Sequence, residues 1–504
     1  MAKKYLFTLR DFSKGQNDKD APNIIENNAL VEAKNAIIGR GYVSKRFGYK
    51  KYSNLLPKPI NNMYTLHKKD GTKEFLSVSD KKLYKDTAGT LTAIPFNVIT
   101  ALSSDNTQII SYKDKDVKDI VLIADGGKLK AYDGTNISEV TPHTATTEQQ
   151  TDPGLNDLAN LTKFRALAIK KDRIFAAAHP DVKNRLSFCH HDPKIGYATY
   201  NYFPATFFID FATTDNDEIM QLEVFRDALV VLCKRSIWIL YGDGRAITDY
   251  EMYQINVPTG CIAPNSVQIV GNDLFYLSDD HVYRMYATDK NFISAKVVSE
   301  NVENTLKKIS RADKEKAVGT FFKDRYYLSF PDGTTLVYDT LLDGWTVWTN
   351  IKANSFLNRD GVLFFGSNSG YVYQFDETIF NDDGVPIEFK MMTKNFDFDY
   401  DVQDKKFKKL WTVAQQYDVK SSTFNVKAQI DYLIRDIVDV STDQSFIWGE
   451  AVWGQMHWGY KEVVQNELRI QLRGKHLQLI FTNDKLDEPF MLYGFALQYK
   501  LKKP

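Results

Sequence analysis

One short segment gathers residue types that bind metal ions: Cys189, His190, His191 and Asp192 stand side by side. Adjacent residues on a strand point to opposite faces, so at most two of these side chains could reach one ion. A structural zinc site needs four ligands, and no second cluster in the chain supplies the others. The segment therefore favours a turn with ordinary polar residues, and we predict no metal site and no cofactor.

A second segment, residues 114–119, begins like a calcium-binding loop with Asp114 and Asp116 at the first and third positions. An EF-hand loop continues with an oxygen ligand at the fifth position and glycine at the sixth, where this chain has Lys118 and Asp119. The pattern favours a solvated hairpin tip.

Catalytic patterns are equally weak. Glycoside hydrolases use a pair of carboxylates, but the acidic residues here fall mainly at turns, where they are expected without any catalytic role. The sequence has no glycine-rich phosphate loop, no GxSxG and no nucleophile with an evident partner. We predict that the protein is not an enzyme.

Cations and aromatic residues alternate in the segment 45–52, which contains Lys45, Arg46 and Tyr49. Such a strand could stack on bases and seat phosphates. The chain has 64 basic and 64 acidic residues, so no global field attracts it to nucleic acid. A strand against a partner protein is favoured, and these three residues are candidates for a subunit interface. A further run, 405–409, is interpreted as a sheet edge that lysines guard against unwanted pairing.

Three Trp-Gly pairs recur every five residues, at Trp448, Trp453 and Trp458. This spacing suits a looped ribbon better than a strand or a helix. The rings could bury as a local core, or they could form an exposed aromatic surface for a neighbouring subunit or a glycan, because Trp is enriched at interface hot spots. We include all three as candidate interface residues.

The elements that would carry these segments are indicated by a repeat. Short apolar runs end in an aromatic residue followed by aspartate, with the aromatic residues 37 to 56 residues apart: Tyr84, Tyr132, Phe188, Tyr241, Tyr286, Tyr338 and Phe375. Units of about 40–50 residues with four strands each are typical of β-propeller blades. The high aromatic content also favours strands.

The predicted fold is all-β: an N-terminal arm, a β-propeller of about six or seven blades and a C-terminal β-sandwich. We divide the chain into residues 1–52 (arm and first strands, with a polar stretch at 13–28), 53–380 (propeller) and 387–504 (sandwich). A chain of 504 residues exceeds what one core usually supports. No apolar run approaches the roughly 20 residues of a membrane span. Three cysteines without a CxxC pattern favour a reducing compartment.

Several segments resemble tail proteins of short-tailed bacteriophages, namely the tail nozzle (tail tubular B) and packaged-DNA stabilisation proteins. The resemblance rests on Ala29–Asn35, Gly41–Val43 and Lys45–Tyr49, on Leu336–Asp339 with Gly344-Trp345, and on the Trp-Gly series with the final strand Gly494–Tyr499. The chain is shorter than the best-known nozzle proteins, so its position in the tail stays open.

The resemblance implies a structural protein of the virion tail, assembled in the host cytoplasm. It implies a ring of copies of the chain, expected to be sixfold, below the portal and adaptor proteins. DNA would pass through this ring without sequence-specific binding, and the family needs no catalytic residues or cofactor. The alternative is a carbohydrate-binding or glycoside-cleaving propeller, whose funnel would hold aromatic residues and paired carboxylates.

Overall fold

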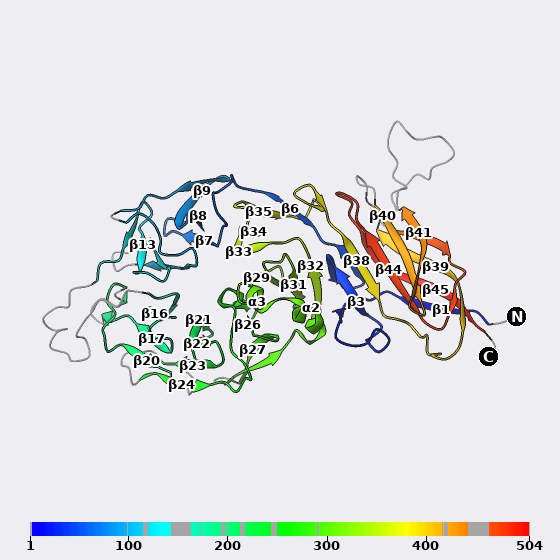
Figure 1. Cartoon of the computed structure of the whole chain (residues 1–504), viewed down its shortest axis with the longest axis horizontal. Helices are drawn as coiled ribbons and strands as arrows, with labels where there is room; N and C mark the ends of the chain where they lie inside the picture. Colours follow the sequence, from blue (N-terminus) through cyan, green and yellow to red (C-terminus); the bar gives the residue numbers. More distant parts are fainter. Residues whose placement is uncertain are drawn as a thin grey trace.

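The computed structural model describes residues 3–97, 99–113, 119–142, 163–171, 173–192, 197–198, 200–211, 217–242, 249–289, 292–415, 417, 422–441 and 463–502. Its regular structure is almost entirely β-strand, as predicted. Figure 1 shows an elongated molecule with a ring of small sheets at one end and a two-sheet sandwich at the other. None of the described helices has the length and apolarity that crossing a membrane requires.

The ring is a β-propeller of seven four-stranded antiparallel blades. The first four blades, from the innermost strand outward, are β7 (Asn62–His67), β8 (Lys73–Ser79), β9 (Lys82–Thr87), β10 (Thr90–Ala93); β11 (Gln108–Lys113), β12 (Asp119–Ala124), β13 (Lys130–Tyr132), β14 (Ile137–Glu139); β15 (Ala166–Lys170), β16 (Arg173–Ala177), β17 (Arg185–Phe188), β20 (Phe208–Asp210); and β21 (Ile219–Phe225), β22 (Ala228–Cys233), β23 (Ile237–Tyr241), β24 (Glu251–Gln254).

The other three blades follow the same order. They are β25 (Gln268–Val270), β26 (Asp273–Leu277), β27 (Val282–Asp289), β28 (Phe292–Val297); β29 (Val318–Phe322), β30 (Arg325–Ser329), β31 (Thr335–Asp339), β32 (Gly344–Trp348); and β33 (Ala353–Arg359), β34 (Val362–Ser367), β35 (Val372–Asp376), with β6 (Gly48–Lys51) as the fourth strand. Beyond β6, the short strands β36 (Asn381–Asp382) and β37 (Val385–Pro386) extend this last sheet. Apolar side chains pack between successive blades, so each sheet buries both of its faces.

The aromatic-aspartate repeat marks the third strand of all seven blades, which confirms its interpretation as the signature of one repeated unit. Where the aspartate side chain is described, it accepts hydrogen bonds from backbone N–H groups of the turn that follows: Asp86 from Gly89, Asp133 from Thr135 and Asn136, Asp339 from Leu341 and Leu342, and Asp376 from Thr378. These aspartates therefore end strands and form turns.

Strand β6 closes the ring. It precedes the first blade in sequence, yet it pairs antiparallel with β35 of the last blade, with Gly48 opposite Asp376 and Lys51 opposite Tyr373. Residues 48–51 thus belong to the propeller and not to the first 52-residue segment where we had placed them. The closure completes the last blade with a strand from the beginning of the chain and so joins the two ends of the repeat.

The sandwich consists of two sheets around one core. One sheet contains β4 (Ala36–Gly39), β5 (Tyr42–Lys45), β45 (Met491–Leu501), β39 (Lys405–Gln415) and β42 (Val463–Arg469), with β1 (Tyr5–Leu9) beside β45 and β43 (Arg473–Gly474) beside β39. The other contains β3 (Ala29–Lys34), β38 (Phe389–Thr393), β44 (Leu477–Asn483), β40 (Thr423–Ile430) and β41 (Leu433–Ser441). Phenylalanines dominate the core, including Phe389, Phe407, Phe424, Phe481 and Phe495.

The second sheet does not stop at the domain boundary. It runs from β29–β32 of the sixth blade through β2 (Gly15–Gln16) and β3 into β38, β44, β40 and β41, so ten strands form one sheet. Gly15 lies so close to the backbone of Trp345 that an added Cβ would be 2.4 Å from its carbonyl oxygen. The propeller and the sandwich are therefore joined by backbone pairing as well as by a covalent connection.

The N-terminal segment has a different role from the arm that we expected. Strands β1 and β3–β5 are built into the sandwich sheets. Within the polar stretch 13–28, the Asp18 carboxylate accepts hydrogen bonds from the N–H groups of Asn304 and Thr305, at the start of helix α2 (Glu303–Lys308). The first turn of a helix leaves its backbone N–H groups without partners inside the helix, and Asp18 accepts from two of these groups in α2. The stretch 13–28 is therefore attached to the start of α2. A second short helix, α3 (Arg311–Lys314), follows.

Candidate binding site at the mouth of the propeller

The inner strands of the seven blades converge around a mouth formed where those strands begin. Two adjoining cavities of about 310 and about 190 Å³ lie there and share Thr107, Gln108, Gln221, Pro264 and Asn265. Their walls come from all seven blades, because residues 61–62, 106–109, 165, 218–221, 264–267, 318–319 and 354–356 all contribute. We call this region the mouth.

Side-chain amides dominate the chemistry of the mouth. Two of them connect neighbouring blades: Asn62 Nδ2 donates to the Thr107 carbonyl oxygen at 2.6 Å, and Gln108 Oε1 accepts from the Leu167 N–H at 2.6 Å. The side chains of Asn61, Asn106 and Asn265 have no hydrogen bond to a described residue. An amide offers both a donor and an acceptor, so the mouth can bind hydroxyl or peptide groups.

Charge at the mouth is nearly balanced. Glu218 is the one carboxylate among the described lining residues, and Lys183 and Lys234 each place Nζ at 3.2 Å from one of its oxygens. Burial opposes ionisation of Glu218, but the hydrogen bonds from the two lysines outweigh it and lower the pKa of the carboxyl group. With one paired carboxylate, the described lining lacks the two-carboxylate arrangement of most glycoside hydrolases.

His179 adds an imidazole to the mouth. Burial is the main cause that lowers the pKa of its imidazole, with Asp181 opposing and the charges of Lys163 and Arg185 assisting. Its Nδ1 accepts a hydrogen bond from the Asp181 N–H at 3.2 Å, which fixes the ring orientation. The arrangement can hold a polar, uncharged ligand, and Phe356 is the only phenylalanine, tyrosine or tryptophan in the described lining.

The predicted interface at Lys45, Arg46 and Tyr49 is corrected by the structure, because these side chains lie inside the chain. Arg46 is fully buried and uses all five of its N–H donors: Nη1 and Nη2 donate to the two Asp382 oxygens, Nε donates to Asn35 Oδ1, and the remaining hydrogens reach the carbonyl oxygens of Phe47 and Thr349. The residue links the sandwich to the last two blades.

Lys45 and Tyr49 serve the same junction. Lys45 Nζ donates to Asn483 Oδ1 at 2.7 Å and to the Lys485 carbonyl oxygen at 3.1 Å. Tyr49 donates its hydroxyl to the Asn350 carbonyl oxygen. The alternation of cations and aromatic residues was a true strand signal, but the partners that bury these side chains are hundreds of residues away in sequence.

Other predicted residues have mixed outcomes. Trp448, Trp453 and Trp458 lie outside the described residues, as do residues 114–118 of the calcium-like segment. Cys189 is fully buried, and burial raises the pKa of its thiol to about 12, so it is held protonated in the core. The described residues form no group of three metal-ligating side chains.

The mouth itself was not predicted. Its asparagines and glutamines stand at or near the starts of inner strands. An amide at or near the start of the first strand in five of the seven blades is the signal that could have found it, but only once the blade register is known.

Comparisons with known proteins identify no family for this chain. No family model matches the sequence, and a search of curated proteins also finds no match. Among solved structures, the extracellular domain of BT4673 from B. thetaiotaomicron is 11% identical with a TM-score of 0.45, over 84% of this chain and 60% of that one. BamB from Moraxella catarrhalis is 12% identical with a TM-score of 0.37, over 74% and 98%.

A third match is the computationally designed Ika8 protein, 11% identical with a TM-score of 0.37, over 65% of this chain and 99% of that one. These comparisons identify no phage tail family. This chain is a β-propeller protein with additional sheets.

Proposed function

We propose that this chain is a non-enzymatic structural subunit of a bacteriophage tail, assembled with other copies into a ring that DNA passes during ejection. The observation that carries the proposal is the ten-stranded sheet shared by propeller and sandwich, because backbone pairing across the junction gives one stiff body suited to a load-bearing assembly. The segment resemblance to tail nozzle and packaged-DNA stabilisation proteins supports the same function. The portal, the adaptor and other tail proteins are its proposed partners.

Ring closure requires a contact between two different surfaces of each copy. With Lys45, Arg46 and Tyr49 buried, the described surface best suited to it is the hairpin between β40 and β41. Tyr432, Leu433 and Ile434 are 77%, 63% and 59% exposed there, and β41 is the last strand of its sheet. An apolar tip beside a strand edge with which no described strand pairs suits a second copy that adds to the sheet.

Two measurements test the proposal. The gene should lie among portal, capsid and terminase genes. Mass photometry of purified protein and of dispersed virions should show a closed oligomer in at least one of the two samples. An isolated monomer in both samples, or a gene surrounded by bacterial housekeeping genes, contradicts the proposal.

A second candidate function is carbohydrate binding at the mouth. The amides of Asn61, Asn106 and Asn265 favour it, because they have no hydrogen bond to a described residue and amides recognise sugar hydroxyl groups. A glycan array should then give signals that fall when Asn61 and Asn265 are both changed to Leu. Release of reducing sugar from a bound glycan would extend this candidate to a glycosidase, and an array without signals would eliminate it.

A further inference from the structure

The lysine run 405–409 does not lie on a sheet edge. Strand β39 is central: it pairs with β45 on one side and with β42 and β43 on the other. Guarding an edge therefore cannot explain these lysines, and our interpretation of them was wrong. Lys405 points inward, where its buried Nζ donates to the Lys475 carbonyl oxygen at 2.7 Å. Lys406 and Lys408 alternate with buried Phe407 and belong to the outer face.

Cations from three strands, together with Lys4 just before β1, form a row across this outer face. Lys406 is opposite Lys500 of β45 on one side and opposite Arg473 of β43 on the other. Tyr5 pairs with Tyr499, so the next position places Lys4 opposite Lys500. Directly opposed residues project to the same face, and strands lie about 4.8 Å apart, so the row extends over roughly 15 Å.

The charges of this row are largely uncompensated. Repulsion by Lys500 is the main cause that lowers the pKa of Lys408, with burial and the charges of Lys406 and Lys4 adding to it. Lys4, Lys406, Lys408 and Lys500 form no ion pair with a described acidic side chain, whereas Arg473 is paired with Asp404. Like charges opposite one another destabilise a sheet. The protein as a whole has zero net charge, so this row is a local concentration of positive charge. An anionic ligand bound there would relieve the repulsion between the lysines.

An indole ring and an exposed apolar side chain lie next to the row. Trp411 is on the same face of β39, half-buried, and Lys409 Nζ lies 5.7 Å from its ring centroid. Leu6, one position beyond Tyr5 on β1, is 64% exposed. Nonspecific single-strand binding combines a cationic track for the phosphates with aromatic rings on which bases stack. A flat array of lysines beside an indole therefore fits an unpaired nucleic acid strand better than a duplex, whose bases are already stacked.

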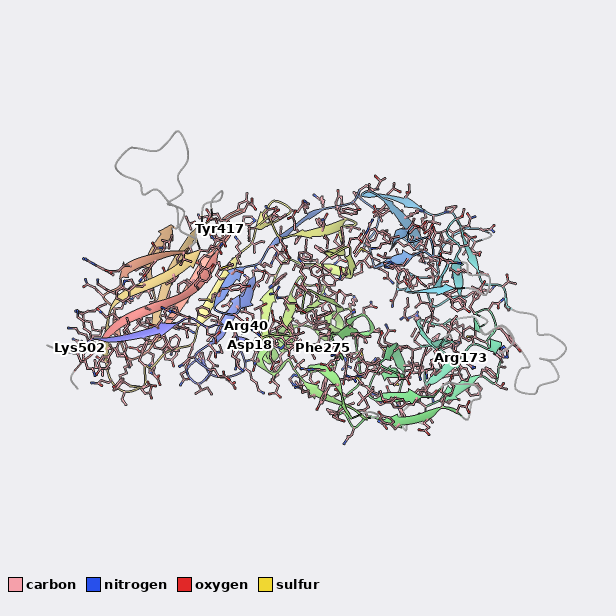
Figure 2. The ribbon with its side chains drawn as sticks, turned by 180° about the vertical axis from the view of Figure 1, so that it is seen from behind. Asp18, Arg40, Arg173, Phe275, Tyr417 and Lys502 are labelled. Atoms are coloured by element: carbon pink, nitrogen blue, oxygen red, sulfur yellow. The ribbon has the colours of Figure 1, made fainter. Side chains whose placement is uncertain are left out.

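We propose that Lys4, Lys406, Lys408, Lys500 and Trp411, which we call the lysine face, bind single-stranded nucleic acid through its phosphates and bases without reading sequence. The face is remote from the mouth: the Lys502 N–H donates to the Asp404 carbonyl oxygen beside the row, and Figure 2 shows Lys502 at the end of the sandwich away from the propeller. The proposal is independent of the proposed tail function.

Fluorescence anisotropy of a labelled oligo(dT) tests it with the full chain. Binding should weaken with added salt, with a logarithmic slope of about −2.8 if four lysines each neutralise one phosphate. Reversing the charge of the two opposed lysines with the double substitution Lys406→Glu and Lys500→Glu should weaken binding at least about tenfold. It should also reduce the magnitude of the salt slope by about half. Trp411→Leu should weaken binding about fivefold or more and leave the slope unchanged.

A matched control is the double substitution Lys316→Glu and Lys352→Glu, which reverses the charge of two exposed lysines in the propeller. Thermal unfolding of every variant should match the wild type, so that a loss of binding is not a loss of fold. The control variant should bind like the wild type.

Four outcomes would overturn the proposal. The first is no binding at low salt, and the second is an equal loss in the control and the reversed pair. The third is binding to vesicles of equal parts phosphatidylcholine and phosphatidylglycerol without binding to oligo(dT), which would assign the face to membranes. The fourth is a changed oligomer mass in the reversed pair with oligo(dT) binding intact, which would assign it to a second copy.

Discussion

Arg46 and Asp382 form a bidentate ion pair with both side chains shielded from solvent, Nη1–Oδ1 at 2.8 Å and Nη2–Oδ2 at 2.5 Å. The arginine comes from the segment between the sandwich strand β5 and the closing strand β6. The aspartate comes from β36 (Asn381–Asp382), which pairs with β6. The ion pair thus fixes the position of the closing strand β6 relative to the sandwich.

Breaking this buried ion pair should lower the free energy of unfolding far more than breaking an ion pair on the surface. Arg46→Met leaves the Asp382 carboxylate buried with one remaining side-chain donor, Asn350 Nδ2, and should lower the free energy of unfolding by about 3–5 kcal/mol. Urea denaturation measures the loss. Lys73→Ala removes the exposed ion pair with Asp360 and should cost less than about 1 kcal/mol. Equal losses in the two variants would contradict a structural role for the Arg46–Asp382 pair.

Lys45 should make stability depend on pH in the alkaline range. Burial is the main cause that lowers the pKa of its ammonium group to about 8, against about 10.5 when the chain is unfolded. Between these values the unfolded chain binds more protons, so the free energy of unfolding contributed by this residue rises with pH. Below pH 8, burial of the charged Lys45 ammonium group lowers the free energy of unfolding by its full amount. This loss of stability disappears as the pH rises toward 10.5.

Comparison with Lys45→Met isolates this residue. The difference in unfolding free energy, variant minus wild type, should fall by about 2 kcal/mol between pH 7 and pH 10. Urea denaturation at several pH values provides the measurement, and subtracting the two proteins cancels other groups that titrate in this range. A difference that stays constant with pH would show that the pKa of Lys45 is not depressed.

The blades could be predicted because their signals are local. An aromatic residue at the end of a strand and the aspartate of the next turn lie within four residues of each other, and Tyr338 and Asp339 are adjacent. The closing strand could not be predicted in this way. Gly48 pairs with Asp376 across most of the chain, and nothing within residues 48–51 specifies that partner.

The candidate sites illustrate the same limit. Lys45 and Arg46 look like surface residues because the sequence shows their charge and hides Asn483 and Asp382, which bury them. The lysines at 406 and 408 were correctly placed on a strand, but whether a strand is central or at an edge depends on β42, β43 and β45, which follow much later. The amides of the mouth come together only when seven blades close.

The three cysteines should be unreactive in the folded protein. Cys189, Cys233 and Cys261 are buried between different pairs of blades, and burial is the main cause that raises the pKa of each thiol to about 12. Because the thiolate is the nucleophile, a disulfide reagent at pH 8 should modify none of them rapidly in the native state and all three in denaturant. Rapid native modification of even one would show that its blade contact opens.

Closure of the ring by β6 should be acutely sensitive to one added methyl group. An added Cβ at Gly48 would lie 1.8 Å from the Asn381 carbonyl oxygen and 2.6 Å from its carbonyl carbon, and both are backbone atoms. Gly48→Ala therefore has to displace β6 from β36, and the cost should reach or exceed the roughly 1–3 kcal/mol of ordinary overpacking. Gly134→Ala is the matched control, because its Cβ would meet nothing within 4 Å and only its φ of +94° is unfavourable. The control substitution should lower the free energy of unfolding by about 1 kcal/mol.

Differential scanning calorimetry should show a clearly lower unfolding temperature for Gly48→Ala than for Gly134→Ala. Limited proteolysis of Gly48→Ala should also cut near residues 48–52, and an unchanged cleavage pattern with an unchanged unfolding temperature would mean that β6 is not what holds the last blade to the ring.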